Sequence, residues 1–173
     1  VHSLAGSINE SGIIDDLKRR GFTLFNCVCE IIANSIDAKG KKLKFIITPH
    51  YIKIVDWGKG MSNEKLTDMF DMLKSNHLNE KSMGISGLGG KVATLKLSKD
   101  QNVFIYTFDG SQYLTANVPW GDIIEQQRYI NMITINSMID DDIKEFKNDR
   151  TDTGTTIILP YDKEVHEEIA KHF

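Results

Sequence analysis

Residues 22–38 read FTLFNCVCEIIANSIDA, and this stretch decides the fold. Its apolar residues recur at helical spacing, whereas Glu30, Asn34 and Asp37 stand at positions i, i+4 and i+7, which share one face of a helix. An ionised carboxylate or a carboxamide is costly to bury without a partner. The aligned polar residues therefore indicate either a pocket that holds something polar, such as a metal-bound phosphate, or the solvated face of an amphipathic helix. This helix alone does not decide between the two.

The next informative segment, residues 52–61, reads IKIVDWGKGM. A β-branched run ends at Asp56, and Gly58, Gly60 and Met61 follow. An acid at a strand end aims an acceptor out of the sheet, and glycines allow a flat ligand or its phosphates to approach the backbone closely. Asp and Gly are also ordinary turn residues. In isolation, this segment would be interpreted as a strand followed by a turn.

A glycine-rich loop follows in residues 84–97, GISGLGGKVATLKL, and opens a helix. Free amide groups at a helix N-terminus form an anion site. The loop is not a P-loop, because Val92 follows Lys91 where Ser or Thr is needed, and its GxxGxG spacing is the reverse of the dinucleotide fingerprint. A lone glycine loop is more commonly a flexible helix entry.

In this order the three segments resemble the boxes of the GHKL ATPase superfamily. Its members include type II DNA topoisomerases, heat-shock-ninety chaperones, histidine kinases, MutL mismatch-repair proteins and MORC ATPases. The family's E-x-x-x-N-[SA]-x-D-A box is matched by residues 30–38, its D-x-G-x-G-[MI] box by 56–61, its glycine lid by 84–89 and its late G-T-x-[IV] motif by 154–157. Each motif alone is weak, but four in order, across roughly residues 22–160, make a specific signal. Trp57 departs from the pattern, which has a small polar residue there, so it is expected either in the core or over the pocket rim.

Periodicity predicts the secondary structure. Helices are expected over 13–20, 22–38, 63–73, 89–97 and 164–172, and strands over 43–48, 51–56, 103–108, 113–118, 129–136 and 155–159. Residues 140–152 are charged and are expected to form a surface connection. The pattern predicts an α+β two-layer sandwich with helices on one face of a mixed, mostly antiparallel sheet. The resemblance implies the same layering, the Bergerat-type ATP-binding fold.

Composition agrees with one soluble domain. The chain has 173 residues, of which 40% are hydrophobic and 26% charged, with a net charge of -3, so no overall positive field draws it to nucleic acid. No apolar run is long enough to span a membrane and no signal peptide is recognised. Cys27 and Cys29 point in different directions on a helix, which favours a reducing compartment. Residues 1–173 are expected to form a single ATP-binding domain of a larger intracellular protein, cytoplasmic or nuclear.

The resemblance implies ATP and Mg²⁺ as ligands. Glu30 is the candidate general base for the attacking water, and Asn34 is the candidate metal ligand, because Mg²⁺ needs few protein ligands beside phosphates and waters. Asp56 would accept from the adenine amino group, with Thr155 supporting that contact. Asp37 could help form the pocket floor or be structural.

The remaining candidates would hold the base and the phosphates. Met61 would pack on the purine ring, and Gly58 and Gly60 would allow its close approach. Phosphate contacts are expected from the amides of Gly84, Gly87 and Gly89. Lys91 is a candidate for the terminal phosphate, although a solvated helix lysine is the commoner role.

Three functions stay open at this point. The favoured one is an ATP-gated clamp or remodelling ATPase of the MORC, chaperone, MutL or topoisomerase sort. In it, a polar lid over residues 74–88 closes on ATP, the domain forms a nucleotide-dependent homodimer, and DNA or a client protein is engaged through other domains. The alternatives are a histidine-kinase catalytic domain and a nucleotide-sensing module that does not hydrolyse. The first-box pattern and the lack of a recognisable phosphoacceptor-histidine helix argue against the kinase, and Glu30 argues against the sensor.

Overall fold

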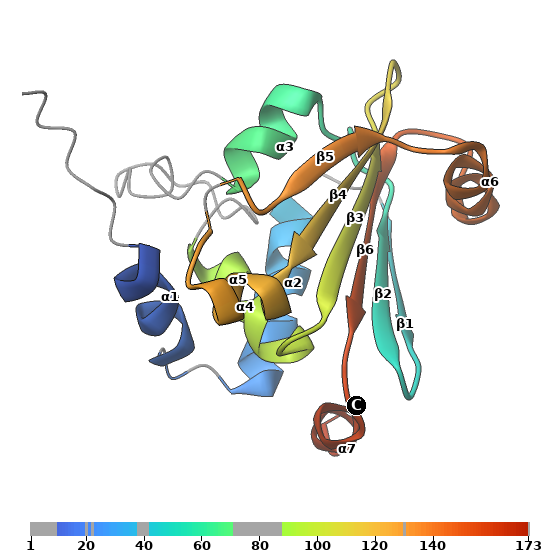
Figure 1. The fold of residues 1–173 in the computed structure, drawn as a ribbon. Helices are drawn as coiled ribbons and strands as arrows, with labels where there is room; N and C mark the ends of the chain where they lie inside the picture. The colour runs from blue at the N-terminus through green and yellow to red at the C-terminus, as the bar shows by residue number, and fades with distance from the viewer. Residues whose placement is uncertain are drawn as a thin grey trace, which may run out of the picture.

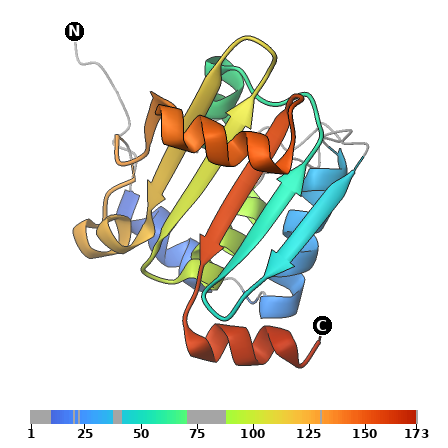
Figure 2. The same ribbon diagram turned by 90° about the vertical axis from the view of Figure 1, so that its right-hand side faces the viewer.

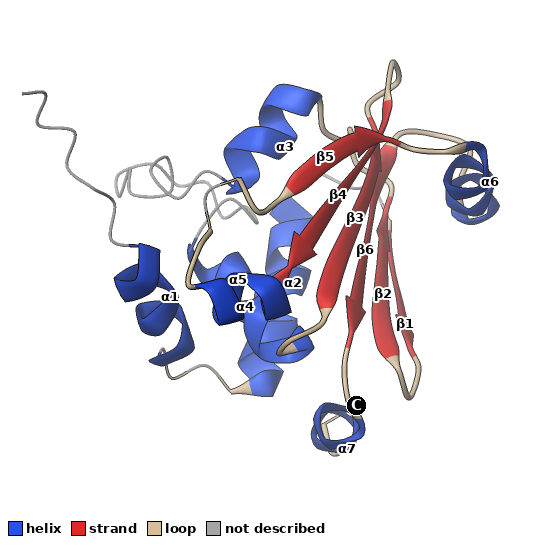
Figure 3. Ribbon diagram, in the orientation of Figure 1, coloured by secondary structure: helices blue, strands red, loops and turns tan. Residues whose placement is uncertain are grey.

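The computed structural model describes residues 10–19, 21, 23–37, 42–70, 88–129 and 131–172. Within them a six-stranded sheet has the order β1-β2-β6-β3-β4-β5, and all of its pairings are antiparallel (Figures 1 and 3). The strands are β1 (Leu43–Ile47), β2 (Tyr51–Asp56), β3 (Asn102–Phe108), β4 (Tyr113–Pro119), β5 (Thr134–Ser137) and β6 (Gly154–Pro160). The α+β architecture predicted from the sequence is therefore confirmed, with an antiparallel sheet in place of a mixed one.

Most of the described helices lie on one side of the sheet. On this inner side are α1 (Glu10–Arg19), α2 (Leu24–Asp37), α3 (Asn63–Phe70), α4 (Leu88–Ser98) and α5 (Trp120–Gln126). The last helix, α7 (Lys163–Ala170), lies beyond the end of β6, and α6 (Asp140–Asp149) crosses the opposite, outer face (Figure 2). The helix on the outer face is an addition to the predicted layering.

The two faces of the sheet differ because side chains alternate along each strand. In β3 and β4 the inner residues are buried and the outer ones half-buried. The inner face and the helices enclose the core, in which Ile105 is 1% exposed and Leu159 and Cys27 are fully buried. Cys29, two residues further along α2, is exposed, because residues two apart on a helix point in different directions.

Residues 140–152, which were expected to form a surface connection, contain the helix α6 over most of their length. Its first turn carries Asp140, Asp141 and Asp142 and its last turn Lys147, so the charges suit the helix dipole. Phe146 is 3% exposed and meets the Tyr113 ring edge-on at 5.9 Å. One buried aromatic residue thus anchors an otherwise polar helix, which hydrophobic periodicity does not detect.

The predicted strand over 129–136 was wrong in its first half, since β5 begins only at Thr134. Before it, Asn131 has a φ of +63, which breaks an extended chain. Tyr129 is instead buried and donates from its hydroxyl to the Phe70 carbonyl oxygen at 2.9 Å. The short helix α5, with the fully buried Trp120 at its start, was not predicted.

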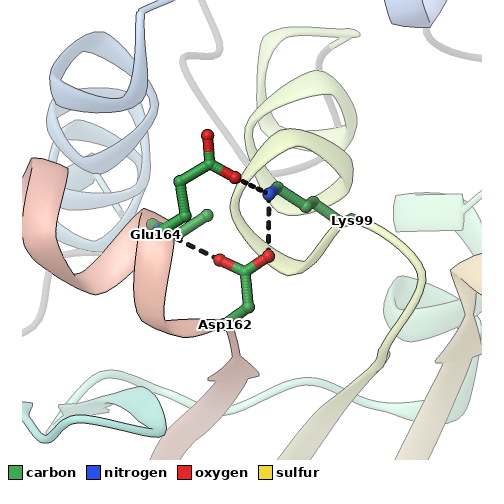
Figure 4. A network of polar contacts seen from close by, with 4 residues as sticks. Lys99, Asp162 and Glu164 are labelled. Carbon is green, nitrogen blue, oxygen red and sulfur yellow. Dashed lines mark hydrogen bonds and ion pairs between the residues drawn. The ribbon is translucent and has the colours of Figure 1, made fainter.

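A polar network joins the end of α4 to the start of α7 (Figure 4). The Lys99 ammonium lies 2.7 Å from an Asp162 oxygen and 3.0 Å from a Glu164 oxygen. Asp162 also caps α7 by accepting from the Val165 amide at 2.9 Å. Because all three charged side chains are well exposed, the network orients α7 more than it stabilises the fold.

None of the described helices is long and apolar enough to cross a lipid bilayer.

The central position of β3 leads to a test of the core. We expect Ile105→Ala to lower the free energy of unfolding by about 2–5 kcal/mol, because it opens a cavity between sheet and helices. The same change at Ile47, which is 39% exposed on the edge strand β1, should cost less than about 1 kcal/mol. Urea denaturation of both variants is the measurement, and equal losses would contradict this assignment of the core.

Candidate functional site

Asp56 ends β2 with a carboxyl group that is anchored on one side. The residue is 7% exposed, and its Oδ1 accepts from the Gly58 amide at 2.9 Å and from the Thr155 amide at 3.1 Å. No donor among the described residues reaches its Oδ2 within hydrogen-bond distance. The protein therefore fixes the direction of this carboxyl group while leaving one oxygen for a donor from elsewhere.

A second polar contact lies beside the first on the inner face. Thr107 on β3 is fully buried, and its Oγ1 accepts from the Met61 amide at 2.8 Å. The same Oγ1 lies 3.0 Å from the Thr155 hydroxyl and 3.2 Å from the Gly154 carbonyl oxygen. The hydrogen bonds join β3, β6 and the loop after β2 into one unit.

Sequence reasoning did not identify Thr107. The sequence feature that could have identified it is a hydroxyl residue on the buried face of β3, which it shares with Val103 and Ile105. A buried hydroxyl at such a position needs hydrogen-bond partners, and the fold supplies them from segments distant in the sequence.

One glycine of the loop, Gly60, has a structural reason to be glycine. Gly60 has a φ of +68, and a Cβ on it would lie 2.0 Å from the Phe108 carbonyl oxygen. The Gly58 carbonyl oxygen accepts from the Thr153 hydroxyl at 2.7 Å. Gly60 therefore makes its close approach to the protein's own backbone, and this packing holds the loop against the end of β3.

Trp57 takes neither of its two expected places. Its backbone amide donates to the Lys42 carbonyl oxygen at 3.1 Å, and its ring has the Lys42 Nζ at 4.6 Å and the Arg150 Cζ at 5.8 Å. Arg150 bonds to Thr156, a neighbour of Thr155 along β6, so it belongs to the outer face. The departure from the family pattern thus lies on the outer face and not on the side of the Asp56 carboxyl group.

The first-box residues share helix α2, which packs against α4. Glu30 is half-buried there. Asn34 and Asp37 lie one and two turns further along the same helix. The structure brings their backbones onto one inner-side helix, as the sequence predicted, and leaves their roles as predictions.

The glycine-rich segment is described only from residue 88 onward. Gly89 and Lys91 lie in the first turn of α4, so this part of the loop does lead into a helix. Gly84, Gly87 and residues 74–87 of the predicted lid lie outside the described residues. Their contacts with phosphate stay predictions from the sequence.

The electrostatics of the site centre on Asp56. Burial raises the pKa of this carboxyl group above its ordinary value, and the Gly58 and Thr155 amides and the charge of Arg150 act in the opposite direction. A donor that reached the second oxygen would further favour the ionised form. The described residues hold no cluster of three or more His, Cys, Asp or Glu side chains that could bind a metal by themselves.

Comparison with known proteins agrees with this fold. A family model described as histidine kinase-, DNA gyrase B-, and HSP90-like ATPase matches residues 22–153, most of the chain. A crystal structure of the N-terminal domain of a DNA repair protein superposes with a TM-score of 0.53 at 14% identity, over 94% of this chain. This chain spans only 45% of the length of that one, and at this identity the likeness concerns the fold alone. No curated protein matches the sequence.

The packing of Gly60 can be tested against a glycine with similar backbone strain. Gly110, in the β3–β4 turn, also has a positive φ, of +101, but a Cβ there would meet only the Thr153 Cγ2 at 3.7 Å. We expect Gly110→Ala to cost about 1–3 kcal/mol of unfolding free energy from backbone strain, and Gly60→Ala to cost clearly more, because the loop must also leave β3. Urea denaturation measures the unfolding free energy of both variants. Equal losses would mean that the loop accommodates the added methyl group of Gly60→Ala without moving away from β3.

Proposed function

The chain belongs to the histidine kinase-, DNA gyrase B- and HSP90-like ATPase family, and we propose that it binds ATP with Mg²⁺ at the Asp56 site and hydrolyses it. The observation that carries this proposal is the carboxyl group of Asp56, held by two amides on Oδ1 and without a described donor on Oδ2. An acceptor that is buried, oriented and half-satisfied suits a ligand that brings one donor.

Adenine brings that donor as its exocyclic amino group. Guanine carries a carbonyl oxygen at the corresponding ring position, which would face the carboxylate with a second acceptor and leave both unpaired. Sites built around a hydrogen bond discriminate strongly against analogues that cannot make it. Thr155, whose amide already orients Asp56, would support the same contact, and Met61, half-buried on the adjoining loop, would pack on the ring.

Hydrolysis is assigned to α2. Glu30 would accept the proton of the attacking water, and Asn34, one turn along, would supply a neutral oxygen to Mg²⁺. This set of oxygen donors fits Mg²⁺, which takes most of its ligands from phosphates and water. When bound, Mg²⁺ would offset the charge of the phosphates. Asn34 would hold the ion, and Glu30 would orient the attacking water.

Phosphate binding is assigned to the glycine segment. Gly89 and Lys91 stand at the start of α4, where amide groups and the helix dipole favour an anion. Gly84 and Gly87, with the segment 74–88, would close on the terminal phosphate. In the full function that we propose, closure promotes dimerisation of a clamp or remodelling ATPase. One solved structure with this fold is the N-terminal domain of a DNA repair protein, which supports DNA as one partner, reached through other domains.

Two alternatives predict different products from the same site. A histidine-kinase catalytic domain would transfer the terminal phosphoryl group to a protein histidine instead of releasing phosphate. A nucleotide-sensing module would bind ATP and return it unchanged. The test uses ATP labelled at its terminal phosphate. Release of labelled free phosphate by the isolated chain, with no label transferred to protein, would separate hydrolysis from phosphotransfer and from nucleotide sensing.

Asp56→Asn should weaken ATP binding by about 1–3 kcal/mol, because a charged hydrogen bond in a buried site is replaced by a neutral one. The matched control is Asp152→Asn, the same change at an exposed residue in the loop before β6, which should leave binding unchanged. Calorimetric titration with MgATP is the measurement. Unaltered affinity of Asp56→Asn would remove the observation on which this function rests.

The same variant should be more stable than the wild type without nucleotide. Burial raises the pKa of Asp56 above its ordinary value, so folding favours the protonated acid, and the stability this contributes is lost as pH rises through the folded-state pKa. Asn imitates the neutral acid, and its side-chain oxygen can still accept from both amides. Thermal unfolding at neutral pH should show the higher midpoint for Asp56→Asn, and a lower one would show that the charge is needed for folding.

Glu30→Ala should keep ATP binding and lower the hydrolysis rate by about 10²–10⁴-fold, as expected for a lost general base. Asn34→Ala should instead weaken binding in the presence of Mg²⁺. Glu64→Ala, an exposed glutamate in the first turn of α3, is the control for both. Phosphate release and calorimetry follow the two effects, and a Glu30 variant that turns over at the wild-type rate would refute the role of that residue.

A further inference from the structure

The structure contains a buried cation on the outer face that the proposed function has not used. Arg150, which ends α6, is 4% exposed. Its Nη2 donates to the Thr156 hydroxyl at 2.7 Å, and its Cζ lies 4.0 Å from the centroid of the Phe146 ring. Its Nε and Nη1 have no hydrogen-bond partner among the described residues. A guanidinium buried with a single neutral hydrogen-bond partner is costly, so a role for its charge is the question to ask.

Arg150 lies directly behind the candidate site. Asp56 pairs with Thr155 across β2 and β6, and Val55 pairs with Thr156, so the partner of Arg150 points to the opposite face from the Asp56 carboxyl group. Gly154, at the start of β6, has no room for a side chain. A Cβ on it would lie 2.6 Å from the Arg150 Nε and 2.2 Å from the Asp56 carbonyl oxygen. The Arg150 side chain and the end of β2 are therefore both packed against Gly154.

The charges of the two residues act on each other. The charge of Arg150 lowers the pKa of Asp56 against the effect of burial. Burial lowers the pKa of Arg150 to about 10, which leaves the guanidinium protonated at neutral pH, and the charges of Asp56 and Asp149 oppose that change. Low polarity around both groups makes their attraction stronger than it would be in water.

Other charged groups of the neighbouring elements are paired or exposed. Asp149 forms an ion pair with Lys53 at 2.6 Å. Lys42 lies over the Trp57 ring, and Lys59 lies in the loop after β2; both are exposed. Glu30 on α2 carries the same sign as Asp56 and cannot favour its ionisation. Arg150 is thus the buried cation of the described surroundings of Asp56.

We propose that Arg150 is a positioning residue for nucleotide binding, which acts through the sheet by keeping the Asp56 carboxylate charged in a site that burial would otherwise neutralise. The consequence for nucleotides rests on the proposed function. The effect on Asp56 itself does not, because it concerns two residues of the free protein. An ionised Asp56 offers acceptors on both oxygens, whereas the protonated acid carries a hydrogen on one of them. Arg150 would accordingly set the lowest pH at which the site binds adenine well.

The direct test is an NMR titration of the Asp56 side-chain carboxyl group in the nucleotide-free protein. We expect Arg150→Met to raise the midpoint, since it removes a nearby opposite charge. Arg150→Lys should restore most of the wild-type value. Lys42→Met, which removes an exposed cation next to the Trp57 ring, should leave the midpoint unchanged. A midpoint that does not move in folded Arg150→Met would overturn the inference.

A second measurement needs no change at Arg150, in case its variants do not fold. In the wild type, the guanidinium Nε signal of Arg150 should show a step with the same midpoint as Asp56, and this step should vanish in Asp56→Asn, where only a step from the neighbouring Asp149 can remain. A step at the Asp56 midpoint that persists in Asp56→Asn would contradict the proposal.

Nucleotide affinity then separates this inference from the proposed function. Titrated with MgATP at decreasing pH, Arg150→Met should lose affinity at a higher pH than the wild type and Arg150→Lys do. If the Asp56 midpoint moves as expected but no protein binds ATP at any pH, the proposed function fails and the pairing of the two residues stands. If ATP binds and its pH profile is the same in all three proteins, the positioning role fails and the proposed function stands.

Discussion

The interaction on which the site depends is the pair of backbone hydrogen bonds to one oxygen of Asp56. The donors are the amide of Gly58, two residues along the chain, and the amide of Thr155, which is 99 residues away. They tie the end of β2 to the start of β6, and Thr107 extends the same unit to β3 and Met61. If these bonds were absent, the carboxyl group would be buried without direction, and the loop with Gly60 would lose its place against Phe108.

The antiparallel sheet gives this unit two unlike surroundings. Its inner face carries the Asp56 carboxyl group, on the same side of the sheet as α2, which bears Glu30, and α4. Its outer face carries Thr156, Trp57 and the end of α6. A sheet is one residue thick, so a charge on one face acts on the other through little intervening polar material. We therefore propose that a charge on the outer face affects the nucleotide site on the inner face, although no outer-face residue contacts the nucleotide.

Much of this arrangement could be predicted from local sequence. The alternation in β3 and β4, the β2 strand that ends at Asp56 and the apolar repeat of α2 each follow from periodicity, and the ordered motifs brought Asp56 and Thr155 together in the prediction. Helix α6 was missed because a single buried Phe146 anchors it among charges. Thr107 and Arg150 were missed because their partners come from distant segments, and neither residue type signals such contacts by itself.

The central claim is that the inner end of β2 and β6 holds an adenine base, and backbone amide NMR during titration with MgATP tests it most directly. We expect the amide signals of Gly58, Met61 and Thr155 to shift together and saturate with MgATP. MgGTP at the same concentration should move them far less. Amides near Tyr106 and Ile158, on the outer face, should stay in place during both titrations. Equal shifts with both nucleotides, or shifts confined to the outer face, would contradict the account.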